Sequence, residues 1–149
     1  MATILPPFFG YEPPPSAELR EHARLLYTRR HEAAVVPFVD VGTDAWRPAM
    51  QDCHGNCEAW CEMHPDYQVV RGWLCMPLDG LAYCRFLAHS VVRQPDGALI
   101  DITPRAPMRR PAPYPFLATI VSANDYEALV VDLYAASETG YLDWHHAQV

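Results

Sequence analysis

Two turn signals divide residues 67–103 into three strand-forming runs, and this pattern constrains the fold more than any other feature of the chain. The tripeptides Leu78-Asp79-Gly80 and Pro95-Asp96-Gly97 are composed largely of residues that favour tight turns. The runs they separate are rich in β-branched, aromatic and other apolar residues. Short connections of this kind join neighbouring antiparallel strands. The sequence therefore predicts a three-stranded antiparallel meander, with its strands at residues 67–76, 81–93 and 98–103.

Helix-forming segments flank this meander on both sides. Apolar residues recur at helical spacing over residues 17–30, directly after the N-capping residue Ser16. A central helix is predicted over residues 53–64, because Pro65 stops it, and a last amphipathic helix over residues 124–136. Helices placed before, within and after a set of antiparallel strands indicate the α+β class.

The length and composition fit one domain. A chain of 149 residues can bury a sizeable core, so we expect a single domain over residues 16–149, preceded by a proline-rich, extended segment over residues 1–15. No apolar run approaches the roughly 20 residues that cross a bilayer. The formal charge of −7 opposes binding to a phosphate backbone. We expect neither a membrane nor a nucleic acid as a partner.

The cysteines and the amino terminus indicate a reducing compartment. The terminus lacks the basic region and the uninterrupted apolar stretch of a signal peptide. Five cysteines is an odd number, and three of them crowd into residues 53–61, unlike a secreted disulfide framework. We expect a cytoplasmic protein.

Cys53 opens the central helix, a position that suits a reactive thiol. The amino terminus of a helix and a nearby imidazolium both favour the thiolate, which is the nucleophilic form. His89, in the second strand, is the histidine expected to lie nearby. Cys57 also lies near the helix start, but one turn further in, where the helix dipole helps less and burial is more natural. Cys53 is therefore the preferred nucleophile and Cys57 the alternative.

The turn at residues 95–97 tests whether His89 can meet Asp101. A three-residue loop places Val91 opposite Asp101, and His89 and Asp101 then share one face as diagonal neighbours about 7–8 Å apart. A side-chain hydrogen bond is within reach at that separation. A two-residue turn would put the two side chains on opposite faces. Each of these polar residues stands among apolar strand neighbours, where an ionisable group requires a partner.

The same residues carry a family resemblance. The segments Cys53-His54-Gly55-Asn56, Ala88-His89-Ser90 and Asp96-Gly97 with Asp101-Ile102-Thr103-Pro104 resemble bacterial papain-fold proteins of the transglutaminase-like group. The resemblance covers about a third of the chain. It implies a papain-like fold in which a nucleophile-bearing helix packs on an antiparallel sheet. It also implies a catalytic triad of Cys53, His89 and Asp101.

These residues together predict a cofactor-free enzyme that transfers acyl groups through a thioester. Cys53 attacks an amide of a protein or peptide, His89 carries the proton, and Asp101 orients the imidazole. Backbone N–H groups at the helix start, with Gln51 as a candidate side-chain donor, would stabilise the oxyanion. The expected activity is that of a cysteine protease, an amidase, a deamidase or a transglutaminase-like enzyme.

A metal-stabilised or partner-binding module without enzyme activity is the alternative interpretation. Cys53, Cys57, Cys61 and His64 fall at helical spacing and can line one face of the central helix. A straight helix, however, spreads its side chains along a line, whereas zinc requires a tetrahedron of ligands. The triad is therefore the preferred interpretation, and we expect no metal.

Overall fold

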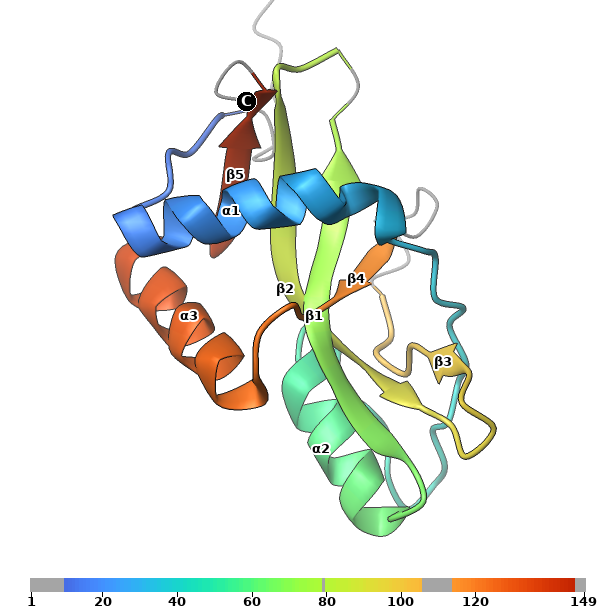
Figure 1. Cartoon of the computed structure of the whole chain (residues 1–149). Helices are drawn as coiled ribbons and strands as arrows, with labels where there is room; N and C mark the ends of the chain where they lie inside the picture. The colour runs from blue at the N-terminus through green and yellow to red at the C-terminus, as the bar shows by residue number, and fades with distance from the viewer. Residues whose placement is uncertain (1–9, 79, 106–113, 147–149) are drawn as a thin grey trace, which may run out of the picture.

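The computed structural model describes residues 10–78, 80–105 and 114–146. Within these ranges the structure has three α-helices and a curled, five-stranded antiparallel sheet (Figure 1). This arrangement belongs to the α+β class, as the sequence predicted. The helices are α1 (Ala17–Arg29), α2 (Cys53–Met63) and α3 (Ala123–Ala136), with a 3₁₀ turn η1 (Arg30–Glu32) after α1. The strands are β1 (Gln68–Pro77), β2 (Tyr83–Arg93), β3 (Leu99–Ile100), β4 (Phe116–Ala118) and β5 (Tyr141–His145).

Serine side chains fix the beginnings of α1 and α3. The Ser16 hydroxyl accepts a hydrogen bond of 3.1 Å from the backbone N–H of Leu19. The Ser122 hydroxyl accepts one of 3.1 Å from Asp125. Each bond satisfies a backbone donor that the helix itself leaves free. The cap predicted at Ser16 is confirmed.

The predicted meander is confirmed, with a shorter third strand. β1 pairs with β2 along its whole length, and β3 pairs with the end of β2. β3 ends at Ile100 instead of residue 103, because the backbone of Asp101 turns away to another partner. Its N–H donates to the carbonyl of Pro37 and its carbonyl accepts from the N–H of Val39, both at 2.9 Å. Residues 34–39 are thus an irregular extended piece held by isolated bridges.

β5 is the element that the sequence pattern did not reveal. It pairs with the first half of β2, from Tyr83↔His145 to Leu87↔Tyr141. β3 pairs with the last two residues of β2. Among the described strands, residues 88–91 of β2 therefore pair with β1 alone. His89 lies in this gap in the pairing.

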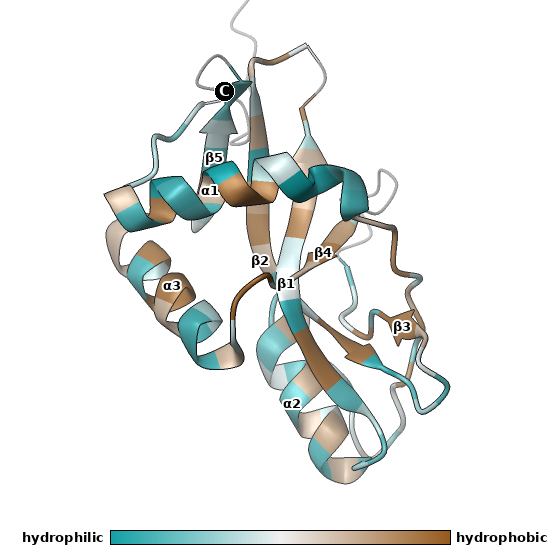
Figure 2. Ribbon diagram, viewed as in Figure 1, coloured by the Kyte–Doolittle hydropathy of each residue, from teal (hydrophilic) through white to brown (hydrophobic). Residues whose placement is uncertain are grey.

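Buried apolar residues form three clusters, the smallest of which consists of Val36, Val91 and Phe116. Helices α1 and α3 pack on one face of the sheet, around Trp73 and Phe86, which are fully buried. A second cluster lies between α2 and the meander, around Cys57 and Val92. In Figure 2 the hydrophobic colour runs along much of β2, β3 and β4, whereas β5 is largely hydrophilic and the helices alternate between hydrophilic and hydrophobic turns. Within the described residues, no helix has the length and apolar character needed to cross a membrane.

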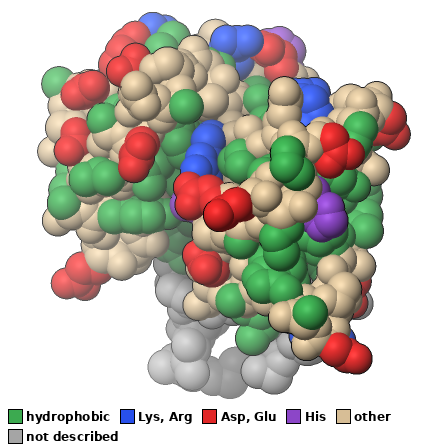
Figure 3. All heavy atoms as spheres, turned by 90° about the horizontal axis from the view of Figure 1, so that it is seen from below, with side chains coloured by type: hydrophobic (Ala, Val, Ile, Leu, Met, Phe, Trp, Pro, Cys, Tyr) green, Lys and Arg blue, Asp and Glu red, His purple; other side chains and the backbone are tan. Residues whose placement is uncertain are grey.

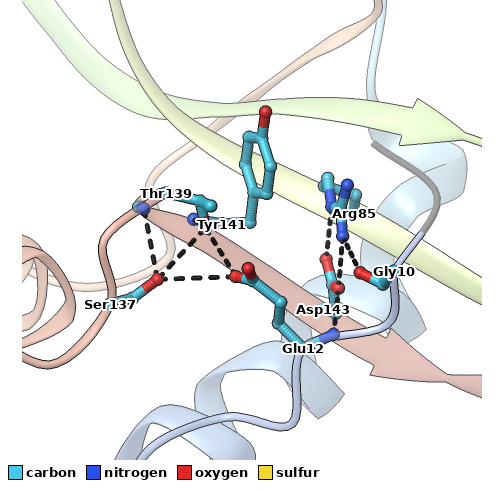
Figure 4. Close-up of polar contacts among 8 residues, drawn as sticks. Gly10, Glu12, Arg85, Ser137, Thr139, Tyr141 and Asp143 are labelled. Atoms are coloured by element: carbon cyan, nitrogen blue, oxygen red, sulfur yellow. Dashed lines mark hydrogen bonds and ion pairs between the residues drawn. The ribbon is translucent and has the colours of Figure 1, made fainter. Parts of the chain in front are cut away.

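The described part of the proline-rich segment, residues 10–15, is bound to a buried ion pair (Figure 4). Arg85 and Asp143 contact each other through two hydrogen bonds of 2.8 and 2.9 Å, and both side chains are fully buried. Arg85 also donates to the carbonyl of Gly10, and the N–H of Glu12 donates to Asp143. Residues 1–9, the rest of the segment predicted as extended, lie outside the described residues.

Candidate active site

Cys53 is the first residue of α2 and is partly exposed. The preceding residue, Asp52, is the N-cap, but its carboxylate accepts no capping hydrogen bond from the backbone of α2. Gln51 has φ = 60°, a left-handed conformation that is strained for a residue other than glycine. The chain therefore enters the helix through a tight, unusual turn, and backbone N–H groups of the first turn lack a capping side chain.

Asn56 fixes this turn from inside α2. Its side-chain amide accepts a hydrogen bond from the N–H of Ala49 at 2.9 Å and donates to the carbonyl of Ala49 at 2.7 Å. It also donates to the Thr103 hydroxyl at 3.1 Å, which lies beyond β3. Asn56 is almost completely buried. One side chain thus ties the loop before Cys53 to the chain segment that carries Asp101.

His89 and Asp101 form a hydrogen bond of 2.7 Å between Nε2 and Oδ2. The loop between their strands has three residues, as the prediction required, because the N–H of Gln94 donates to the carbonyl of Ala98. The other carboxylate oxygen of Asp101 accepts a hydrogen bond of 3.0 Å from the N–H of Thr103. The carboxylate is therefore oriented on both sides.

The structure brings Cys53 into the same group. Burial disfavours the imidazolium form of His89, but hydrogen bonds with Asp101 and with Cys53 outweigh this cost and raise the pKa of His89 to about 9. Because Nε2 is hydrogen-bonded to Asp101, Nδ1 is the ring nitrogen that remains for the hydrogen bond with Cys53. All three residues of the predicted triad thus lie in one cluster, although they come from a helix, a strand and a strand end.

His54, the neighbour of Cys53 in sequence, has the opposite electrostatic environment. Burial, followed by the charges of Arg71 and His89, lowers the pKa of His54 to about 4. Its Nδ1 lies 2.5 Å from the hydroxyl of Ser90 and 3.3 Å from Arg71 Nη1. This pattern assigns the ring proton to Nε2, which is buried and has no hydrogen-bond partner among the described residues. The pKa values of the two histidines are thus displaced in opposite directions.

Arg71 is the residue of this cluster that sequence reasoning missed. It lies on β1 directly opposite Ser90 and donates a hydrogen bond of 3.1 Å to that hydroxyl. It also forms an ion pair of 2.5 Å with Glu58 of α2. Only the register of β1 against β2 reveals these contacts. Seen from below in Figure 3, basic, acidic and histidine side chains adjoin near the middle of the face, between patches of hydrophobic side chains.

Cys57, the alternative nucleophile, lies in an unsuitable environment. It is fully buried among Val92, Ile100 and Ile102. Burial raises the pKa of Cys57 well above its usual range, so its thiol stays protonated. The predicted side-chain oxyanion donor, Gln51, is exposed in the loop before α2, and its role stays a prediction.

The described residues contain no group of three or more His, Cys, Asp or Glu side chains arranged to hold a metal ion. On α2, Cys57 turns into the apolar core, and the ring of His64 stacks on Trp60 with centroids 3.9 Å apart. These side chains do not converge as the alternative interpretation requires.

Comparison of the chain with protein-family models, with curated proteins and with solved structures finds no match. The functional assignment therefore depends on the chemistry of the cluster itself.

Proposed function

We propose that this protein is a thiol-dependent acyl-transfer enzyme with a papain-like core, which acts on an amide bond through a thioester. The observation that carries the proposal is the position of the His89 ring. It is hydrogen-bonded through Nε2 to the buried Asp101 carboxylate at 2.7 Å, and its pKa is raised by both Asp101 and Cys53 after burial has opposed protonation. A thiol, an imidazole and a carboxylate in contact in this order are the parts of a cysteine catalytic triad.

The first half of the reaction forms the thioester. The proton of Cys53 passes to His89, and the sulfur attacks the amide carbon, so that an S–C bond forms and the carbonyl oxygen becomes an oxyanion. The C–N bond then breaks, and the leaving amine takes the proton from His89. Asp101 keeps the ring in place and stabilises the imidazolium while the proton is there.

The second half resolves the thioester. His89 takes a proton from water or from an acceptor amine, whose oxygen or nitrogen attacks the thioester carbon. The S–C bond breaks and the proton returns to Cys53. Water as the acceptor gives hydrolysis or deamidation, whereas an amine gives transamidation. The oxyanion of both halves lies close to the start of α2, where backbone N–H groups and the helix dipole favour negative charge.

The five cysteines are all unpaired. A thiol enzyme that retains free cysteines, two of them at partly exposed positions, fits a reducing compartment. This supports the proposal that the protein acts in the cytoplasm.

The decisive experiment measures which thiol reacts. The protein is treated briefly with iodoacetamide at about pH 6, where an ordinary thiol with a pKa near 8.5 is almost entirely protonated. Peptide mass spectrometry then gives the rate for each cysteine. We expect Cys53 to react much faster than the other four, and the effect to disappear in His89→Ala.

Cys57→Ser is the matched control, because Cys57 lies on the same helix but faces the core. This variant should leave the rate at Cys53 unchanged. A Cys53 that reacts no faster than a free model thiol at the same pH contradicts the proposed function.

A further inference from the structure

Arg71 contacts the sequence neighbours of both residues that the proposed reaction uses. Its Nη1 contacts Ser90, the residue after His89, at 3.1 Å, and His54, the residue after Cys53, at 3.3 Å. Its strand position opposite Ser90 directs it toward α2. A cation thus reaches the immediate neighbours of the nucleophile and of the base, from a third element of the fold.

The charge of Arg71 also acts on titratable groups around the site. Burial is the largest influence on the pKa of His54, Cys57 and Tyr126, and the positive charge of Arg71 lowers the pKa of each. The contacts of Nη1 are with a hydroxyl and with an imidazole that is neutral at physiological pH. Neither of these partners neutralises the guanidinium.

The anion that does pair with Arg71 is weakly held. Glu58 contacts Nη2 through one carboxylate oxygen, and its side chain is 62% exposed, whereas that of Arg71 is 22% exposed. An ion pair in which one partner is so exposed contributes little, because water and salt screen it. A carboxylate that binds the guanidinium through two oxygens makes a stronger, better-oriented contact.

We propose that Arg71 binds a carboxylate of the substrate in exchange for Glu58, so that the preferred acyl donor carries an anionic group near the reacting carbonyl. This inference rests on the proposed function, since it assigns the substrate class of the same site. The competing explanation is that Arg71 and Glu58 only attach α2 to β1.

The experiment compares two small reagents that differ in charge. Iodoacetate and iodoacetamide both alkylate a thiolate, with formation of an S–C bond and release of iodide, but only iodoacetate carries a carboxylate. The ratio of their rates at Cys53, measured by peptide mass spectrometry, reports attraction of an anion to the site. Dividing the two rates cancels any change in the ionisation of the thiol itself.

Two substitutions should move this ratio in opposite directions. Arg71→Gln removes the cation, and we expect the ratio to fall by about three- to tenfold. Glu58→Gln removes the competing anion, and the ratio should rise. Both effects should shrink as salt is added. Arg24→Gln removes an arginine that is also paired with a glutamate, but on the exposed surface of α1, and should leave the ratio unchanged.

The carboxylate that binds Arg71 could be the carboxyl terminus of a peptide or an acidic side chain, and bromoacetyl peptides distinguish these two sources. Bromoacetyl-Gly-Gly has a free carboxyl terminus, its terminal amide has none, and bromoacetyl-Asp-amide has an acidic side chain instead. If the terminal carboxylate is the ligand, only the first reagent gains from Arg71. If an acidic side chain is the ligand, only the third gains.

A ratio that stays the same in both Arg71→Gln and Glu58→Gln overturns the inference, and Arg71 is then a structural residue. If Arg71→Gln fails to fold, the ratio measured in Glu58→Gln alone tests the inference. Glu58 is exposed, so this substitution should not disturb the core. Failure of the proposed function looks different: Cys53 then lacks enhanced reactivity toward iodoacetamide at about pH 6, whatever the ratio measured at higher pH.

Discussion

At the scale of single residues, the cluster depends on one carboxylate. Asp101→Asn keeps the shape of the side chain but removes the negative charge that stabilises protonated His89. The pKa of His89 should fall, and a neutral His89 gives the sulfur of Cys53 less electrostatic support. We expect iodoacetamide labelling of Cys53 at about pH 6 to slow by tenfold or more, since one pKa unit is a tenfold change.

The test is a pH series of labelling rates on wild type and on Asp101→Asn. Thr103→Ser is the control, because it retains the hydroxyl that Asn56 contacts. A variant that keeps the wild-type pH profile would show that Asp101 does not act on His89 in the way its hydrogen bond indicates.

His54 should make the fold sensitive to acid. Its pKa of about 4 in the folded protein lies below the ordinary value of 6.5, so the unfolded chain binds more protons between these pH values. The stability that neutral His54 contributes is present above pH 6.5 and is lost as the pH falls toward 4. In His54→Gln, the free energy of unfolding should therefore fall less over this interval. One proton corresponds to at most about 1.4 kcal/mol per pH unit, and partial exposure of the ring reduces this.

Urea unfolding at pH 6.5 and at about pH 4.5 measures the difference. His31→Gln serves for comparison, because His31 is exposed on η1. If both variants lose stability in acid as steeply as wild type, the buried state of His54 has no part in the pH dependence.

Residue contacts were predictable where a short loop determines them. Counting residues across the turn at 95–97 sufficed to place His89 and Asp101 on one face, because the side chains of a strand alternate. The contacts of Arg71 with Ser90 and His54 were not predictable in this way. They require the register between β1 and β2 and the packing of α2, which no local pattern specifies.

At the scale of elements, the close approach of β4 to β1 depends on a glycine. A Cβ atom at Gly72 would lie 2.2 Å from the carbonyl oxygen of Leu117 and 2.7 Å from the ring of Phe116. Gly72→Ala must push β4 away or distort β1, and we expect a loss of about 2–4 kcal/mol in the free energy of unfolding. Chemical denaturation measures this loss.

Gly10→Ala is the matched substitution, because nothing lies within 4 Å of the Cβ position there. It should change stability by less than about 0.5 kcal/mol. Equal effects of the two substitutions would contradict the close packing of β4 on β1.

The three helices and the meander were predictable from capping residues, helical spacing and turns, all of which are local signals. β5 was not, because its partner lies more than fifty residues earlier in the chain. β3 was predicted too long for a related reason. The backbone of Asp101 prefers residues 37 and 39, and this contact joins segments that only the complete fold brings together.

At the scale of the whole molecule, the Arg85–Asp143 pair joins the two ends of the described chain to the sheet. Asp143→Ala would leave the Arg85 guanidinium fully buried without its carboxylate. Removal of one partner of a buried pair typically costs about 3–5 kcal/mol. We therefore expect a large drop in the urea midpoint, together with loss of the contact at Glu12.

Glu21→Ala breaks an ion pair on the exposed surface of α1 and should hardly move the midpoint. The double variant Arg85→Met, Asp143→Leu should recover much of the loss, since an apolar pair needs no charge compensation. A single Asp143→Ala variant as stable as wild type would contradict the strength assigned to this pair.

The same ion pair governs how the molecule responds to mechanical force. A force that pulls residues 10 and 146 apart would act first on β5 and on the contacts of Arg85. The hydrogen bond between Arg85 and Gly10 and the pairing of β5 with β2 connect these two points directly. Helix α2, which begins at Cys53, and the segment after β3 that carries Asp101 lie outside that short path. The cluster of Cys53, His89 and Asp101 should therefore keep its shape under tension until the hydrogen bonds of Arg85 have broken.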